Sequence, residues 1–150
     1  MAFTPSFYLG LIIAIYLLGY IVGELLDWLN LRYSRQPLPP EAAGIYDATE
    51  YERAQAYQRD RTRFGFITSA FNTLLTLAFL WWGGFGWLDR LLSAYIEQPV
   101  WLALAFFGVL MLAADLLNIP FQLYATFVIE EKYGFNKTSL KTFVLDKLKG

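Results

Sequence analysis

The residues of this chain that are best suited to chemistry, by type and spacing, are carboxylates within otherwise apolar segments. Glu24 and Asp27 are three positions apart, so on a helix they lie about one turn from each other. Two carboxylates at this spacing suit acid–base catalysis or a cation site. The alternative is that both lie at a membrane surface and meet Arg32 or Arg35.

A third carboxylate, Asp115, is the single charge in an apolar block that runs from Val100 to Ile119. An ionisable group at the centre of a membrane span costs roughly 2.5–3.5 kcal/mol on insertion scales. We expect Asp115 near the cytoplasmic end of its block, where this cost is lower. Its side chain either faces a cavity or makes a structural ion pair or a hydrogen bond to the backbone. Asn72, in the preceding apolar block, is a further candidate for a cavity or an interface.

Histidine and cysteine are absent from the 150 residues. Without cysteine there are no disulfides, thiolate nucleophiles or cysteine-rich metal sites. Without histidine the chain lacks the usual acid–base group at neutral pH, the commonest zinc ligand and any His-Glu-x-x-His motif. We therefore predict no catalytic residue, metal ligand or cofactor in this chain. A metal-independent enzyme that uses Glu24, Asp27, Asp115 or Glu130 is a further alternative.

Three apolar blocks must position these side chains. The chain is 57% hydrophobic and 17% charged, whereas a soluble domain carries about 25% charged residues. Each block has the roughly twenty residues that a helix needs to cross a hydrocarbon core of about 30 Å. We place the spans at about 7–30, 64–82 and 100–120 of a single unit, 1–150. The lipid bilayer is therefore one partner.

The sequence predicts an all-α membrane protein with three long transmembrane helices, the second and third extending into the cytosol, plus short amphipathic helices. Asp47 is a cap for the second long helix, and Gly134 ends the third after a proline kink near 116–120. The last short helix either lies on a surface or leads into a further span. The expected helices are 5–32, 48–82, 88–96, 99–134 and 140–148, with a proline-containing linker at 33–41 and a glycine-rich break at 83–86.

Basic residues are distributed unevenly around these spans. Six arginines lie between the first and second spans and five lysines follow the third, whereas Arg90 is the single basic residue between the second and third. The positive-inside rule then places the first loop and the C-terminus in the cytoplasm and the N-terminus outside. Asp60 and Arg63 are three positions apart on one helix, which is close enough for a weak ion pair. The net charge of −1, with acids among the basic residues, argues against a nucleic-acid partner.

The segment from Phe127 to Thr138 has a composition that is unusual for a loop. Taken by itself, it is typical of a solvated helix end with a Gly-Phe-Asn cap. Its polar and cap residues, which we call the signature, are Glu130, Glu131, Lys132, Gly134, Phe135, Asn136, Lys137 and Thr138.

The signature also resembles a segment of the type I CAAX prenyl endopeptidases, which are membrane zinc metalloproteases. The resemblance covers about 8–149, and it is carried by Pro39-Pro40-Glu41, Tyr51 to Tyr57, Arg63 to Phe66, Asn118 to Phe121 and, above all, Thr126 to Thr138. It implies a ring of transmembrane helices around a large intramembrane chamber, with zinc held on the cytosolic side. It implies cleavage of prenylated proteins and, in bacterial members, of other membrane proteins. The signature is implied to lie on the side of the active site, without an assigned catalytic role.

In this family the zinc ligands lie downstream of the similar region, and the present sequence ends at Gly150. The resemblance therefore implies an N-terminal membrane domain without the catalytic zinc domain, inactive alone, in the bacterial inner membrane or the endoplasmic reticulum. Its expected partners are the missing C-terminal half or a second copy of itself. The alternative is a stand-alone membrane scaffold or interaction protein that binds a partner or lipid.

Overall fold

The computed structural model describes residues 4–34 and 47–149, and these residues form helices without any strand. Three helical stretches, Pro5–Tyr33, Ala48–Trp81 and Pro99–Glu130, are long and apolar enough to cross a membrane. The all-α prediction with three long helices is confirmed. The elements are α1 Pro5–Tyr33, α2 Ala48–Trp81, α3 Gly84–Ser93, α4 Pro99–Tyr124, the π-helix η2 Ala125–Glu130 and α5 Leu140–Lys149.

The ends of the long helices follow from local sequence signals. Pro5 and Pro99 each stand at the start of a helix, where a missing N–H costs no helical hydrogen bond. The carboxylate of Asp47 accepts hydrogen bonds from the backbone N–H groups of Thr49 at 2.8 Å and Glu50 at 3.0 Å, which confirms the predicted cap. From residue 35 onward the predicted linker, including Arg35 and its prolines, lies outside the described residues.

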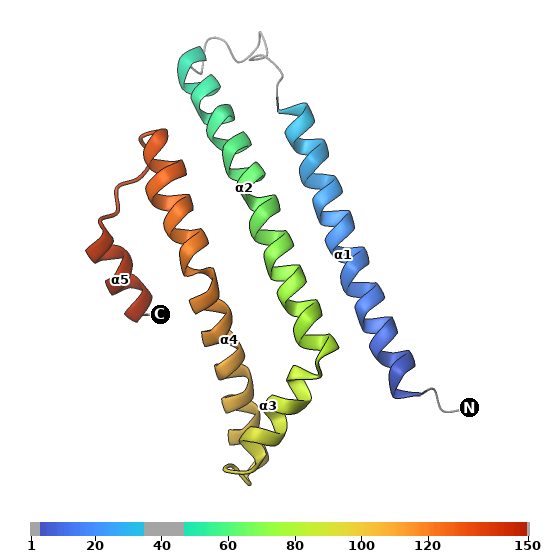
Figure 1. Cartoon of the computed structure of the whole chain (residues 1–150). Coiled ribbons are helices and arrows are strands. Elements are labelled where there is room, and N and C mark those ends of the chain that lie inside the picture. Colours follow the sequence, from blue (N-terminus) through green and yellow to red (C-terminus); the bar gives the residue numbers. More distant parts are fainter. Residues whose placement is uncertain (1–3, 35–46, 150) are drawn as a thin grey trace.

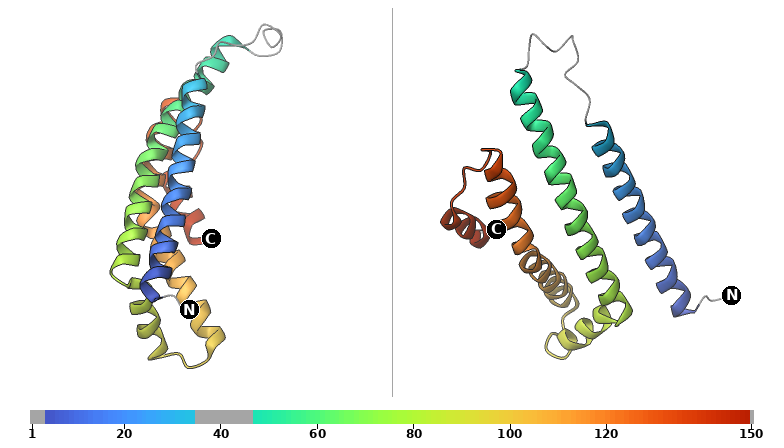
Figure 2. Two further views of the ribbon diagram at one scale, coloured as in Figure 1. Left: turned by 90° about the vertical axis from the view of Figure 1, so that its right-hand side faces the viewer. Right: turned by 45° about the horizontal axis from the view of Figure 1, so that its top comes forward.

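The three long helices form an open row with α2 in the middle (Figure 1). α1 packs against one side of α2, and η2 packs against the other side. Seen at right angles to this view, the three helices overlap in a thin, curved layer (Figure 2). The described residues therefore form a wall one helix thick, and Thr73, Leu88 and Ile129 are among its few buried side chains.

The break between α2 and α3 is shorter than the predicted glycine-rich break. Gly83 alone has a left-handed backbone, with φ of 68°, whereas Gly84 and Gly86 belong to α3, which ends at Ser93. The prediction of a helix from 88 to 96 was therefore wrong at both ends. Packing requires a glycine at position 84, because a Cβ atom there would lie 2.5 Å from the ring of Phe79.

The third long helix continues through Pro120 as predicted, and it changes to π-helical geometry over η2. Because the helix runs on to Glu130, Asp115 lies in the middle of the Pro99–Glu130 stretch. The helix extends beyond the apolar block that ends at Ile119, so the position of Asp115 near the cytoplasmic end of that block stays a prediction. α5, close to its predicted bounds, folds back beside α4 (Figure 1).

Candidate functional site

The signature begins as the C-terminal cap of η2. Gly134 has φ of 70°, which a residue with a Cβ adopts only with strain. The N–H of Phe135 donates to the carbonyl of Glu130 at 2.9 Å, and the N–H of Gly134 donates to the carbonyl of Glu131 at 3.0 Å. These are the two hydrogen bonds of a Schellman motif, and they confirm the predicted cap at Gly134.

The loop after this cap is held by the side chain of Asn136. Its amide donates to the carboxylate of Glu131 at 2.9 Å, and its carbonyl oxygen accepts from the backbone N–H of Thr138 at 2.7 Å. Lys137, between these partners, is exposed. The fold therefore uses Asn136 to shape the turn that leads toward α5.

Asp60 on α2 anchors the signature through two hydrogen bonds. The ammonium of Lys132 lies 2.6 Å from the Asp60 carboxylate, and the hydroxyl of Tyr133 donates to the same oxygen at 2.7 Å. The Asp60 carboxylate, followed by the Tyr133 hydroxyl, raises the pKa of Lys132 above its ordinary value. Helical spacing predicted a weak pair between Asp60 and Arg63. Arg63 acts on Asp60 only through its charge, and the close partner of Asp60 is Lys132.

Tyr57, one turn before Asp60, contributes aromatic contacts to the same junction. Its ring meets Phe135 edge-on with centroids 4.9 Å apart and Tyr133 at 5.8 Å. Its hydroxyl accepts from Arg61 at 2.7 Å and makes a long contact of 3.4 Å with Glu130. We call Tyr57, Asp60, Glu130, Lys132, Tyr133 and Phe135 the signature junction.

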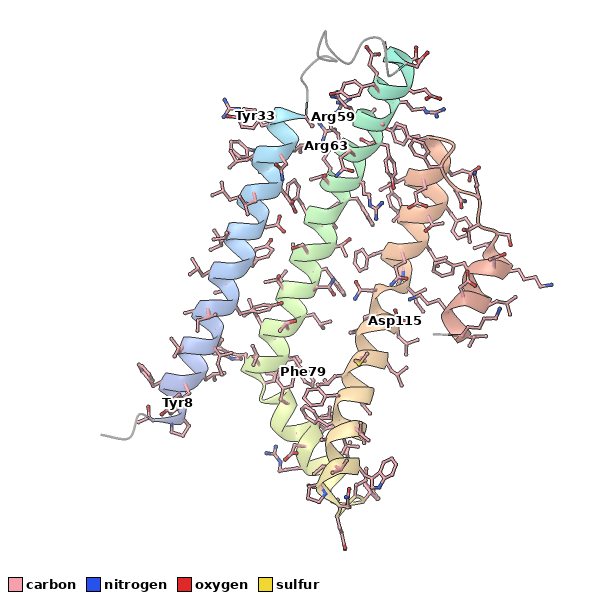
Figure 3. The ribbon with its side chains drawn as sticks, turned by 180° about the vertical axis from the view of Figure 1, so that it is seen from behind. Tyr8, Tyr33, Arg59, Arg63, Phe79 and Asp115 are labelled. Atoms are coloured by element: carbon pink, nitrogen blue, oxygen red, sulfur yellow. The ribbon has the colours of Figure 1, made fainter. Side chains whose placement is uncertain are left out.

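An open pocket of about 630 Å³ lies between α4, η2 and α5, next to the signature. Asp115, Thr126, Glu130 and Thr138 bring polar groups to it, and α5 contributes Lys147. The ammonium of Lys147 makes an ion pair with Asp115. α5 is also fixed by the ring contact of Phe143 with Phe127. Asp115 therefore both faces a pocket and makes a structural pair, which were the two alternatives for this residue (Figure 3).

Asn72 connects α2 to α4 through a reciprocal pair of amides. Asn72 donates to Asn118 at 3.0 Å, and Asn118 donates back at 3.1 Å and to the carbonyl of Ala114 at 2.8 Å. Such a pair fixes the relative position of two membrane helices but adds little stability, because the amides also find hydrogen-bond partners when the helices are apart.

We expect Asn118→Leu to destabilise the α2–α4 contact by about 0.6 kcal/mol, with an upper bound near 1.7 kcal/mol. Asn72→Leu should cost a similar amount, and the double variant should cost little more than either single variant. Unfolding in detergent micelles, followed by circular dichroism, measures the four free energies of this cycle. Additive losses would show that the two amides act independently.

Glu24 and Asp27 have different surroundings. The half-buried carboxylate of Glu24 accepts a hydrogen bond from the hydroxyl of Ser69 on α2, whereas Asp27 is exposed. The guanidinium of Arg32 lies over the ring of Trp28, 5.7 Å from its centroid. Glu24 therefore serves as a contact between α1 and α2, and the structure does not bring the two carboxylates together on a shared partner within the described residues.

The residues around the signature fall within a recognised domain. The family model described as "CAAX prenyl protease N-terminal, five membrane helices" matches residues 27–150. The chain belongs to the CAAX prenyl protease family. The resemblance found in the sequence is thereby confirmed, and this chain is an N-terminal membrane domain of the family.

Curated relatives cover nearly all of the chain. It is 34% identical to the probable CAAX prenyl protease 1 of Schizosaccharomyces pombe, over 97% of this chain and 34% of that protein. It is 32% identical to the CAAX prenyl protease 1 homolog of Oryza sativa subsp. japonica, over 95% of this chain and 36% of that protein. The chain thus spans about a third of the length of these relatives.

A solved structure shares the fold. The crystal structure of S. mikatae Ste24p matches 99% of this chain and 36% of its own chain, with a TM-score of 0.82 and 24% sequence identity. The agreement extends over all the described helices, so the thin row of helices is an arrangement that also occurs in that larger protein.

The side chains of residues 4–34 and 47–149 do not fit a zinc site. Zinc in proteins is held by His, Cys, Asp or Glu side chains, usually four-coordinate. The sequence has neither His nor Cys, and residues 4–34 and 47–149 contain no group of three His, Cys, Asp or Glu side chains that could hold a metal ion. The chemistry of zinc is therefore not assigned to any of the described residues.

Proposed function

We propose that this chain forms part of the wall of the intramembrane chamber of a CAAX-prenyl-protease-like zinc metalloendopeptidase. The observation that carries the proposal is the polar pocket beside α4. A charged pair between Asp115 and Lys147 in the middle of a long apolar helix requires a water-filled or protein-lined space, because facing lipid is costly. A wall one helix thick, with polar groups along its middle, suits such a chamber.

The zinc site and the catalytic groups of this enzyme lie in residues other than these 150, so the chain is inactive alone. The names of the relatives support prenylated CAAX proteins as substrates, and membrane proteins are a broader substrate class. In this function the chain contacts the lipid part of a substrate, and it associates with a catalytic half or with a second copy of itself.

The test combines this chain with a separately produced polypeptide that corresponds to the remaining two thirds of a curated relative. We expect the two to purify together and to cleave a prenylated CAAX peptide, and we expect a zinc chelator to abolish the cleavage. Each polypeptide alone should give only the background rate. Mixing without association or cleavage would favour the stand-alone scaffold, and a stable monodisperse monomer in detergent would support that outcome.

The proposed orientation places the signature junction in the cytoplasm and the N-terminus outside. Because the chain contains no cysteine, a single introduced cysteine reports on one position. In sealed cells, Glu97→Cys between α3 and α4 should react with a membrane-impermeant maleimide, whereas Lys137→Cys should react only after the membrane is permeabilised. The opposite labelling pattern would reverse the orientation.

A further inference from the structure

A second pocket, of about 310 Å³, opens between α2 and η2 beside the signature junction. Its polar lining consists of Asp60, Arg63 and Lys132, and its apolar lining includes Ile67, Tyr124 and Val128. Arg63 is the last charged residue of α2 before an uncharged stretch that runs to Trp81. Arg63 lies toward the end of α1 that carries Tyr33, just below Arg59, and away from Tyr8 and Phe79 (Figure 3).

The pocket has one uncompensated positive charge. Asp60 makes its ion pair with Lys132, 2.6 Å away, and so cancels one of the two cations. Arg63 is exposed and makes no ion pair with any of the described residues, although its charge acts on the Asp60 carboxylate at longer range. An arginine left in this state presents a fork of N–H donors that suits the oxygens of a phosphate.

An apolar track leads away from this charge into the membrane-spanning part. Ile67, Phe71 and Leu74 follow Arg63 along the same side of α2 at helical spacing, and all three are exposed, Ile67 to 60%. On the facing side, Tyr124 and Val128 are also exposed. A cation at the membrane boundary with exposed apolar side chains below it matches both parts of a phospholipid.

We propose that this pocket binds an anionic membrane phospholipid, with its phosphate at Arg63 and an acyl chain along Ile67 and Val128. The proposal does not depend on the protease function. A free anion would use the charge but leave the apolar track uncovered, and a second copy of the chain would have to bring a carboxylate to Arg63. Both are outcomes that the experiment separates from lipid binding.

Native mass spectrometry of the purified full chain in detergent tests the proposal. The probes are phosphatidylglycerol and phosphatidylcholine with identical acyl chains, added at equal concentrations. We expect phosphatidylglycerol to bind about fivefold more tightly, the factor that corresponds to about 1 kcal/mol for one basic residue near a membrane surface. Arg63→Gln should remove this preference, and Arg63→Lys should keep part of it.

Arg90→Gln is the matched control, because it removes the same charge from α3, which lies at the opposite end of α2 (Figure 1). It should leave the preference unchanged. Asp60→Asn should strengthen phosphatidylglycerol binding about fivefold by freeing the charge of Lys132, so the proposal does not depend on one variant alone. Circular dichroism checks that each variant is folded.

Four results would overturn the proposal. Equal binding of the two lipids by the unmodified chain would exclude a headgroup site. An equal loss of preference in Arg63→Gln and Arg90→Gln would assign the preference to overall charge. Displacement of phosphatidylglycerol by millimolar inorganic phosphate would indicate a site for a free anion, and dimers in place of lipid adducts would indicate a second copy on this surface.

Discussion

Tyr57→Ala is expected to lower the free energy of unfolding by about 2–3 kcal/mol, because it removes a half-buried aromatic ring from the signature junction. The ring makes edge contacts with Phe135 and Tyr133, which come from the chain beyond η2. These contacts and the ion pair of Asp60 with Lys132 join α2 to the signature. Loss of the ring should therefore loosen the signature from α2, and not only destabilise α2 itself.

Tyr57→Phe is the control for this effect. It keeps the ring contacts but removes the hydroxyl that accepts from Arg61 and makes the long contact with Glu130. We expect a loss below about 1 kcal/mol, the net value of an ordinary hydrogen bond. Unfolding in mixed micelles measures both variants, and proteolysis at the nearby Lys137 reports whether the signature has loosened. Equal losses for Tyr57→Ala and Tyr57→Phe would mean that the hydroxyl contacts, and not the ring, hold the junction.

Gly84→Ala is expected to cost about 1–3 kcal/mol, the usual price of forcing extra atoms into a packed contact. The added Cβ would lie 2.5 Å from the ring of Phe79. The ring of Phe79 cannot move freely, because it packs edge-to-face against Phe85 with centroids 4.8 Å apart. The change should therefore displace α3 from the end of α2.

Gly86→Ala on the same helix separates this clash from the general effect of removing a glycine. A Cβ there would meet the Arg90 side chain at an ordinary 3.5 Å. Alanine favours the helix, so this variant should be neutral or more stable by up to about 1 kcal/mol. Thermal unfolding of both variants in one detergent checks the difference, and similar shifts for the two would argue against a specific contact at Gly84.

The helices and their caps could be predicted because their causes are local. Apolar blocks of sufficient length indicated α1, α2 and α4, Asp47 marked the start of α2, and Gly134 marked the end of η2. The same local logic did not find the start of α3. Gly84 looks like a helix breaker in the sequence, whereas in the fold it is the small residue that a neighbouring ring requires.

The partners of the polar residues could not be predicted, because they are distant in the sequence. Asn72 was a candidate, but its partner is Asn118, and the partner of Asp115 is Lys147 at the far end of α5. Helical spacing suggested Arg63 as the partner of Asp60, whereas the fold places Lys132 in an ion pair with Asp60. The sequence did not single out Ser69, which donates a hydrogen bond to Glu24, beyond its being a hydroxyl in an apolar span.

The open row also has a consequence for how the chain is assembled during synthesis. α1 and η2 each pack on α2, which lies between them. Helices that insert one after another into a membrane can dock in the order of their synthesis when each new helix meets one already present. α1 can therefore dock as soon as α2 has inserted, and the third span can dock on α2 as it inserts in turn. The return of α5 comes after these steps, because Lys147 reaches Asp115 only once the third span is in place.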